Sequence, residues 1–269
     1  MKKIKILNLL LVFLLIFSLF TTIAIAEDDT IGKIVKRGTI KVGFCVDVPP
    51  MKFRDKNNEP AGICADFTKA LARDLGVKLE YVFSDWAGLI PTLLSGRSDV
   101  IITDMSTTLE RAKKVNFTSP WMVTGTYIVV RNDSEWESWK DMNKEGVKLG
   151  CILGTIGEQN VKSVIPKATP TTYNSNVEQR LALKQGRIEG LANDLLLTSR
   201  EVTKSEGLFR LLPDPLEADA LGFTLRADDY HFLIWMNLWI EHLTATGEYD
   251  ELMNYWVYTD EWEKDYPGY

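Results

Sequence analysis

Short apolar segments alternate with amphipathic segments along most of the chain, which is the pattern of strands followed by helices. Residues 40–46 read as a strand, 66–75 as a helix ended by Gly76, and 78–83 as a second strand. The same pattern predicts further helices at 89–94, 195–203 and 229–246, and further strands at 127–130, 147–153 and 223–225. A strand followed by a helix, repeated in this way, predicts α/β architecture with parallel sheets.

Three predicted helices begin with Ser or Thr followed three residues later by Glu, which is the capping-box pattern. These helix starts are Thr107 to Glu110, Thr155 to Glu158 and Ser175 to Glu178. Because the strand–helix pattern begins again after Gly125, we expect two sequential α/β units and hence two lobes. In such sheets the ligand-binding groups lie at the carboxyl ends of the strands, so a ligand is expected between the lobes.

The first 26 residues have the composition of an export signal. Lys2, Lys3 and Lys5 precede an apolar run at 9–20, and Ala24-Ile25-Ala26 supplies small residues for cleavage after Ala26. The apolar run is short and is followed by polar residues, which favours a cleaved signal over a retained membrane anchor. The sequence therefore predicts a periplasmic protein.

The chain has a formal net charge of −6, and removal of the predicted signal makes it more acidic, because that segment contains three Lys and no acidic residue. An acidic chain is a poor partner for nucleic acid. His231 and His242 are its two histidines, and their spacing matches no metal motif. Since no nucleophile elbow and no phosphate-binding Gly-rich loop is present either, we expect no metal, no cofactor and no catalytic residue.

Arg111 is the most informative single residue. It follows the apolar strand pattern at 99–103 and lies at the start of a predicted helix, where backbone N–H groups favour an anion. A guanidinium there can hold a carboxylate through two parallel hydrogen bonds. Thr155 and Asp194 lie at similar strand-to-helix junctions and could add a carboxylate contact and an ammonium acceptor. Taken alone, the pattern favours an ordinary helix cap for Thr155 and Asp194 and a solvated surface cation for Arg111.

Taken together, these segments resemble the family 3 solute-binding proteins that supply polar amino acids to ABC importers. The resemblance extends over nearly the whole chain after the signal and is carried by 43–53, 62–66, 86–91, 99–111, 117–121, 154–155 and 193–194. It implies a periplasmic binding protein-like fold, with two α/β lobes joined by a two-segment hinge and the ligand cleft between them. The lobes are then expected to be formed by 27–125 with 222–269 and by 126–221. It also implies a monomer that passes a small-molecule ligand, an amino acid, to the membrane permease of an ABC transporter.

The resemblance implies specific roles as well. The family residue matching Arg111 clamps the α-carboxylate, and the one matching Asp194 takes the α-ammonium. Those matching Ser106 and Thr155 add carboxylate contacts, and an aromatic at the position of Trp86 covers the ligand.

Several residues depart from the family pattern and bear on the ligand. Asp104 replaces a small residue, so its carboxylate could bind the ligand amine or reject acidic ligands. Ile156 replaces a residue that is often Ser or Thr, and Asp47 is a further expected ligand contact within 43–53. Cys45 and Cys64 stand where binders of basic amino acids have acidic residues. A polar or small neutral amino acid is therefore the expected ligand.

The two cysteines at these positions could form a disulfide in an oxidising compartment, with Cys151 remaining as a buried small apolar residue. The competing interpretation is three independent buried thiols. The sequence leaves both open.

Two other functions remain open at this point. Cyclohexadienyl dehydratases resemble this family and are exported enzymes, but the general acid of that family, a Glu, falls at Leu197, which has no proton to donate. A purely sensory protein that presents its ligand to a membrane receptor would show the same binding residues.

Overall fold

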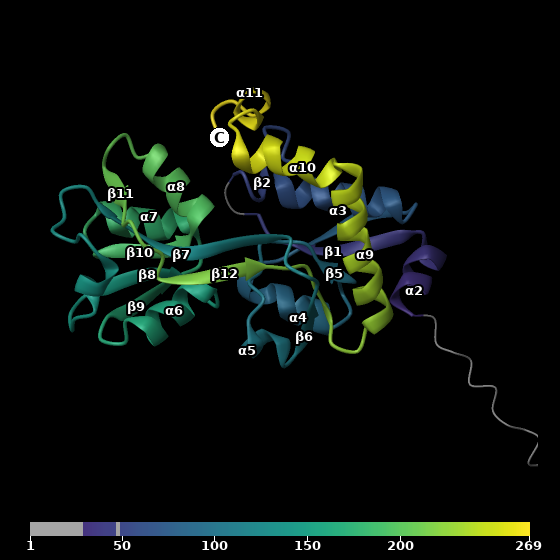
Figure 1. Ribbon diagram of the computed structural model, residues 1–269, viewed down its shortest axis with the longest axis horizontal. Coiled ribbons are helices and arrows are strands. Elements are labelled where there is room, and N and C mark those ends of the chain that lie inside the picture. Colours follow the sequence, from purple (N-terminus) through teal and green to yellow (C-terminus); the bar gives the residue numbers. More distant parts are fainter. Residues whose placement is uncertain (1–28, 47–48) are drawn as a thin grey trace, which may run out of the picture.

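The computed structural model describes residues 29–46 and 49–269 and divides them into two lobes, each built around its own sheet (Figure 1). This arrangement confirms the predicted two-lobed α/β fold. The predicted export signal and its cleavage site after Ala26 lie outside the described residues. Within the described ranges, no helix combines the length and the apolar character needed to cross a membrane.

The first lobe contains a five-stranded sheet in the order β4-β1-β5-β13-β6 and a separate two-stranded pair, β2-β3. Strand β1 is parallel to β4 and β5, whereas β13 is antiparallel to β5 and β6. The strands of this lobe are β1 (Thr39–Phe44), β2 (Phe53–Arg54), β3 (Pro60–Ala61), β4 (Lys78–Phe83), β5 (Val100–Ile101), β6 (Val115–Phe117) and β13 (Thr224–Arg226). Its helices are α2 (Thr30–Arg37), α3 (Ile63–Asp74), η1 (Trp86–Gly88), α4 (Leu89–Leu94), α5 (Leu109–Ala112), α9 (Tyr230–Thr246), α10 (Glu248–Met253), η3 (Asn254–Tyr258) and α11 (Trp262–Asp265).

The second lobe contains a six-stranded sheet in the order β11-β7-β10-β8-β9, with β12 paired to β7. Its strands are β7 (Met122–Arg131), β8 (Lys148–Ile152), β9 (Thr169–Tyr173), β10 (Gly190–Asp194), β11 (Phe209–Leu211) and β12 (Glu217–Leu221). Its helices are η2 (Trp139–Met142), α6 (Ile156–Val164), α7 (Asn176–Lys184) and α8 (Leu195–Thr203).

The prediction of purely parallel sheets is wrong, because both sheets are mixed. Strand β7 runs antiparallel to β10, and β13 runs antiparallel to β5. Parallel pairing is required where consecutive strands of one sheet are joined by a crossover helix. Here the chain instead enters each sheet from the other lobe, so the entering strand is free of that constraint.

Strands β7 and β12 pass between the lobes as an antiparallel pair (Figure 1). Their register runs from Met122 opposite Leu221 to Thr126 opposite Glu217. Ser106, from the first lobe, forms an isolated antiparallel bridge with Leu221. The connection between the lobes is therefore a two-stranded ribbon, close to the loop that precedes α5.

The C-terminal helices pack into the core of the first lobe. Trp239 and Trp256 are buried against Phe67 and Phe53 respectively. Their indole N–H groups donate to acidic side chains of α3, at 2.8 Å for Trp239 to Asp74 and 2.7 Å for Trp256 to Asp66. Cys151 is buried in the core of the second lobe, as expected.

The predicted bounds were accurate for several elements that are specified by residues close together in the sequence. Strand β4 and helices α4 and α8 have the predicted bounds, and α6 and α7 begin at the predicted caps Thr155 and Ser175. The cap of α5 was predicted one residue early, because Thr108 rather than Thr107 accepts the hydrogen bond from the Arg111 N–H.

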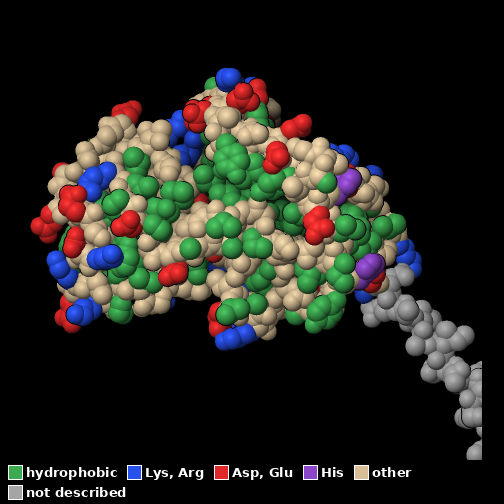
Figure 2. Space-filling model, viewed as in Figure 1, with side chains coloured by type: hydrophobic (Ala, Val, Ile, Leu, Met, Phe, Trp, Pro, Cys, Tyr) green, Lys and Arg blue, Asp and Glu red, His purple; other side chains and the backbone are tan. Residues whose placement is uncertain are grey.

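The surface in Figure 2 carries acidic and basic side chains interspersed among hydrophobic ones over both lobes. No continuous basic patch is visible on that face. This agrees with the acidic composition, which disfavours a nucleic-acid partner.

Candidate functional site

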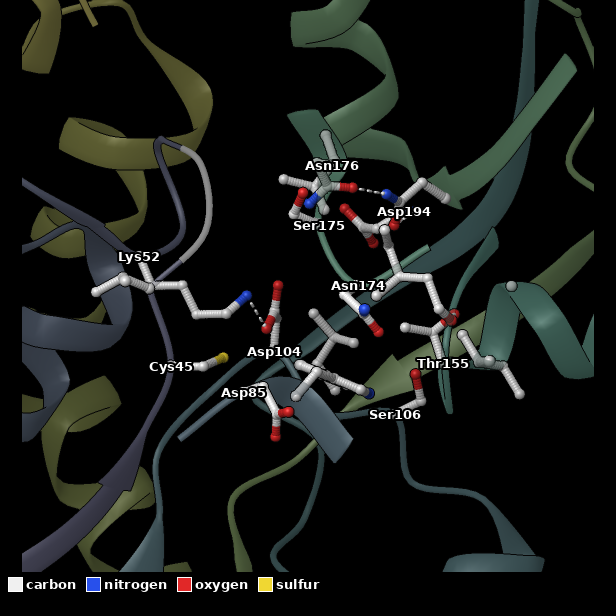
Figure 3. Close-up of a pocket in the computed structure, with 18 of the residues that line it drawn as sticks. Cys45, Lys52, Asp85, Asp104, Ser106, Thr155, Asn174, Ser175, Asn176 and Asp194 are labelled. Atoms are coloured by element: carbon white, nitrogen blue, oxygen red, sulfur yellow. Dashed lines mark hydrogen bonds and ion pairs between the residues drawn. The ribbon is translucent and has the colours of Figure 1, made fainter. Parts of the chain in front are cut away.

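A cavity of about 200 Å³ lies between the two lobes (Figure 3). The first lobe contributes Cys45, Val46, Lys52, Asp85, Trp86, Asp104 and Ser106 to its lining. The second lobe and the connecting strand β12 contribute Ile152, Thr155, Ile156, Gly157, Asn174, Ser175, Asn176, Asn193, Asp194, Leu197, Asp219 and Leu221. Because this space is enclosed by side chains from both lobes, it suits a small molecule.

Three helices of the second lobe begin at the cavity, and the N-cap residue of each one lines it. These residues are Thr155 for α6, Ser175 for α7 and Asp194 for α8. Each cap accepts a backbone hydrogen bond from the first turn of its own helix. Since a helix N-terminus carries partial positive charge, this wall favours negative groups in the cavity.

Asp194 is the acidic group of this wall. Its Oδ2 accepts from Thr124 Oγ1 at 2.7 Å, and its Oδ1 accepts from the Leu196 N–H at 2.8 Å. Burial raises the pKa of Asp194 to about 6, and the nearby charge of Asp104 acts in the same direction, while the Thr124 bond opposes both. A cation in the cavity would favour the ionised form of this carboxyl.

Arg111 does not itself line the cavity but contacts residues that border it. Its guanidinium is buried, with Nη1 donating to the Ser106 carbonyl at 2.9 Å and Nη2 to the Gly154 carbonyl of the second lobe at 3.0 Å. Burial lowers the pKa of Arg111, an effect that the negative charges of Asp219 and Asp104 oppose. Among the described residues, no carboxylate lies within ion-pair distance of it. Arg111 is thus a buried cation, held by carbonyls, that spans the two lobes.

Trp86 borders the cavity and lies close to both cations of the first lobe. Lys52 Nζ is 5.4 Å and the Arg111 Cζ is 5.8 Å from the centre of its ring. Its indole N–H points to the Gly154 carbonyl at 3.4 Å, across the gap between the lobes. The ring therefore lies at the cavity wall, between the two buried cations and the second lobe.

Lys52 is a cavity residue that sequence reasoning missed. Its Nζ lies 2.5 Å from Oδ1 of Asp104, and the two side chains are 1 % and 6 % exposed (Figure 3). The available signal was a lysine between Met51 and Phe53, in a segment otherwise read as apolar. Asp104 is consequently already engaged by a cation from its own lobe.

Asp219 was also missed. It lies on β12, and the Ser106 hydroxyl donates to its Oδ2 at 2.5 Å. Burial raises the pKa of Asp219, and the Ser106 hydrogen bond opposes that shift. No pattern in the sequence around Asp219 distinguishes it from a solvated strand residue.

The structure brings six of the eight predicted site residues to the cavity wall: Trp86, Asp104, Ser106, Thr155, Ile156 and Asp194. Arg111 lies next to the wall, and Asp47 falls outside the described residues. In the described part of the chain, no group of three or more His, Cys, Asp or Glu is arranged to hold a metal ion.

The disulfide considered between Cys45 and Cys64 is not formed in this structure, in which all three cysteines are buried thiols. Cys45 packs against Leu89 and Met105, whereas Cys64, in the first turn of α3, belongs to the main core of the first lobe. Burial raises the pKa of Cys64 well above its usual value, which keeps it protonated.

Leu197 is buried and lines the cavity. This is the position at which resemblance to a dehydratase would require a general acid. A leucine there gives the cavity an apolar surface instead of a proton donor.

Comparison with known proteins matches residues 40–259 to the family described as bacterial extracellular solute-binding proteins, family 3. The L-cystine-binding protein TcyJ of Escherichia coli (strain K12) is 26% identical over 235 residues, covering 87% of this chain and 88% of that protein. Among solved structures, the ancestral amino acid-binding protein AncCDT-1, a precursor of cyclohexadienyl dehydratase, is 37% identical with a TM-score of 0.78, covering 84% of this chain and 99% of that one. A putative ABC transporter binding component from Wolinella succinogenes, complexed with lysine, is 29% identical with a TM-score of 0.78, covering 85% of this chain and 99% of that one.

Proposed function

Since the chain belongs to the family 3 bacterial extracellular solute-binding proteins, we propose that it captures a polar or small neutral amino acid between its lobes and delivers it to an ABC importer. In this proposal the protein is a monomeric periplasmic carrier, cleaved after Ala26, whose protein partner is the membrane permease. It is a binding protein rather than an enzyme, in agreement with the binding proteins to which it is similar.

The observation that carries the proposal is the placement of opposite charges on the two lobes. Asp194, from the second lobe, lines the cavity, and Arg111, from the first lobe, lies beside the wall and donates to the carbonyl of Ser106, which lines it. An amino acid presents a carboxylate and an ammonium on the same carbon, so it can engage both charges and hold the lobes together. Trp86 would then cover the ligand.

The carboxylate end is assigned to Arg111 with Ser106, Thr155 and the first turn of α6. A buried guanidinium with only carbonyl partners gains from an anion, because a charge-assisted bidentate pair is stronger than its neutral hydrogen bonds. Ile156 and Gly157, in the first turn of α6, also line the cavity. A helix start at the cavity supports this assignment, because its backbone N–H groups favour an anion.

Opening and closing are proposed to occur about the ribbon formed by β7 and β12, between a lobe of 27–125 with 222–269 and a lobe of 126–221. The contacts from Arg111 and Trp86 to the Gly154 carbonyl then belong to the closed state. Ligand entry requires that these contacts break.

Relatives in this family bind different amino acids, including lysine in the Wolinella succinogenes protein and cystine in TcyJ, so the ligand has to be identified with this chain itself. Thermal-shift screening of the purified protein against the common amino acids tests the proposal. A ligand at 100 times its dissociation constant stabilises the folded state by about 2.7 kcal/mol. A protein whose Tm no amino acid raises is not an amino acid carrier.

A further inference from the structure

Recognition of the α-carboxylate and α-ammonium of a ligand does not explain why the ion pair between Lys52 and Asp104 lies in the cavity. Both residues line the cavity, both side chains are almost fully buried, and Nζ and Oδ1 are 2.5 Å apart. Neither residue is needed to hold an α-carboxylate or an α-ammonium in the arrangement proposed above. Both residues of the pair line the cavity and are therefore left for contact with the ligand side chain.

Stability is a weak explanation for this pair. Removing two charges from water costs several kcal/mol per ion, and apolar residues of similar size often stabilise a fold equally well. Met51 and Phe53, the chain neighbours of Lys52, and Cys45, which lines the cavity with it, are buried and apolar, so the neighbourhood does not itself require an ion pair. A pair retained on a cavity wall under these conditions points to a role in recognition.

The charge distribution indicates what that role is. Lys52 places a resident ammonium beside the face of Trp86, where a cation is also favoured by the ring. Asp104, one of four carboxylates that line the cavity, already has Lys52 as its partner. A guanidinium or ammonium on the ligand would therefore meet a like charge and find this acceptor occupied.

We propose that Lys52, held by Asp104, is a specificity-determining residue that excludes amino acids with cationic side chains by occupying their place in the cavity. This inference rests on the proposed amino-acid binding and adds the class of side chain. In the wild-type protein the resident ammonium restricts the ligand to amino acids whose side chains carry no positive charge.

The test compares the wild type with Lys52→Met by thermal shift against the common amino acids, followed by titration calorimetry with L-arginine, L-lysine and L-glutamine. Removing the ammonium leaves the Asp104 carboxylate available, so the affinity for L-arginine or L-lysine should increase at least about tenfold relative to that for the best neutral amino acid. Lys69→Met is the matched control, because Lys69 pairs with Asp66 on the exposed face of α3. Its ligand preference should equal that of the wild type.

A lone Asp104 carboxylate in the cavity could prevent Lys52→Met from folding, which circular dichroism would reveal. The double variant Lys52→Met/Asp104→Asn then carries the test, since it removes both charges. Its affinity ratio of L-arginine to L-glutamine should still rise, because the repelling ammonium is gone.

The possible results are distinguishable. A wild type that prefers L-arginine or L-lysine overturns the inference while leaving amino-acid binding intact. An unchanged ratio in the folded Lys52 variant overturns it as well. No response to any amino acid, in the wild type or the variants, removes the proposed function itself and this inference with it.

Discussion

The two walls of the cavity are built in different ways. The second-lobe wall consists of helix starts, and its caps Thr155, Ser175 and Asp194 each bond to their own helix. The first-lobe side has two buried cations, Lys52 on the wall and Arg111 beside it, and each has a partner distant in the sequence, Asp104 for Lys52 and the Gly154 carbonyl for Arg111. The second wall is therefore assembled locally, whereas the first depends on long-range packing.

The two lobes also differ in the partners of their charged groups. In the first lobe, the Lys52 ammonium already has its counter-ion, and Arg111 is held by carbonyls. In the second lobe, Asp194 has hydroxyl and backbone donors and a pKa raised to about 6, so its charge responds to what enters the cavity. The first lobe therefore provides charged groups that protein partners hold in position. The second lobe provides a carboxylate whose cationic partner would be the ligand.

The largest effect is expected from removing the cation that connects the walls. Arg111→Ala should weaken amino-acid binding by about 2 to 5 kcal/mol, because the ligand carboxylate loses a buried charged partner. Arg111→Lys should restore binding only in part, since an ammonium cannot form the bidentate pair. Titration calorimetry measures both.

Lys113→Ala is the control for Arg111, because Lys113 lies two residues away and its side chain is 69 % exposed. Its affinity should match that of the wild type. Unchanged affinity in folded Arg111→Ala would remove Arg111 from the carboxylate site.

The next effect tests the second wall. Asp194→Asn should weaken binding of α-amino acids by about 1.5 to 3 kcal/mol, the usual contribution of a hydrogen bond to a charged group. Deaminated analogues of the same ligand should lose much less, since they have no ammonium. Equal losses for the two ligand types, measured by calorimetry, would contradict the assignment of Asp194.

A smaller effect is expected from pH. Below about pH 6 the Asp194 carboxyl of the empty protein is increasingly protonated, so the affinity for an α-amino acid should fall as the pH falls, by up to about tenfold per unit. Calorimetry from pH 7.5 to pH 4.5 measures this slope. Asp194→Asn should flatten it, and an equal slope in that variant would assign the titration to another group, such as Asp219.

The same shift predicts how the empty protein responds to pH. Because the folded-state pKa of Asp194 lies above its ordinary value of 3.8, the contribution of this group to stability is complete below about pH 4 and is lost as the pH rises through about 6. In thermal unfolding of the empty protein, the wild type should lose this stability over that pH range, whereas Asp194→Asn should not show this loss. A saturating α-amino acid should remove it.

The smallest effect is a change in shape. If the lobes close about β7 and β12, saturating ligand should lower the radius of gyration in small-angle scattering, because the ligand holds the Arg111 and Asp194 sides together. An identical scattering curve with and without ligand would argue against a hinged clamp.

Residues next to one another in the chain made much of the second wall predictable. A cap and the N–H group that it satisfies are three residues apart or fewer, so the caps of α6, α7 and α8 could be read from the order of residues alone. Resemblance to a family then assigned Arg111, Ser106 and Trp86 to the same site. The structure places all of these residues at or beside the cavity.

The sequence therefore determined the local elements, the two-lobed class and six of the residues that line the cavity. Only the tertiary structure decided the partners of the buried charges and the mixed direction of the strands. Lys52 and Asp104 are 52 residues apart, and Ser106 and Asp219 are 113 apart. Such pairs depend on how distant segments pack, and the energy of that packing is not encoded in the neighbours of either residue.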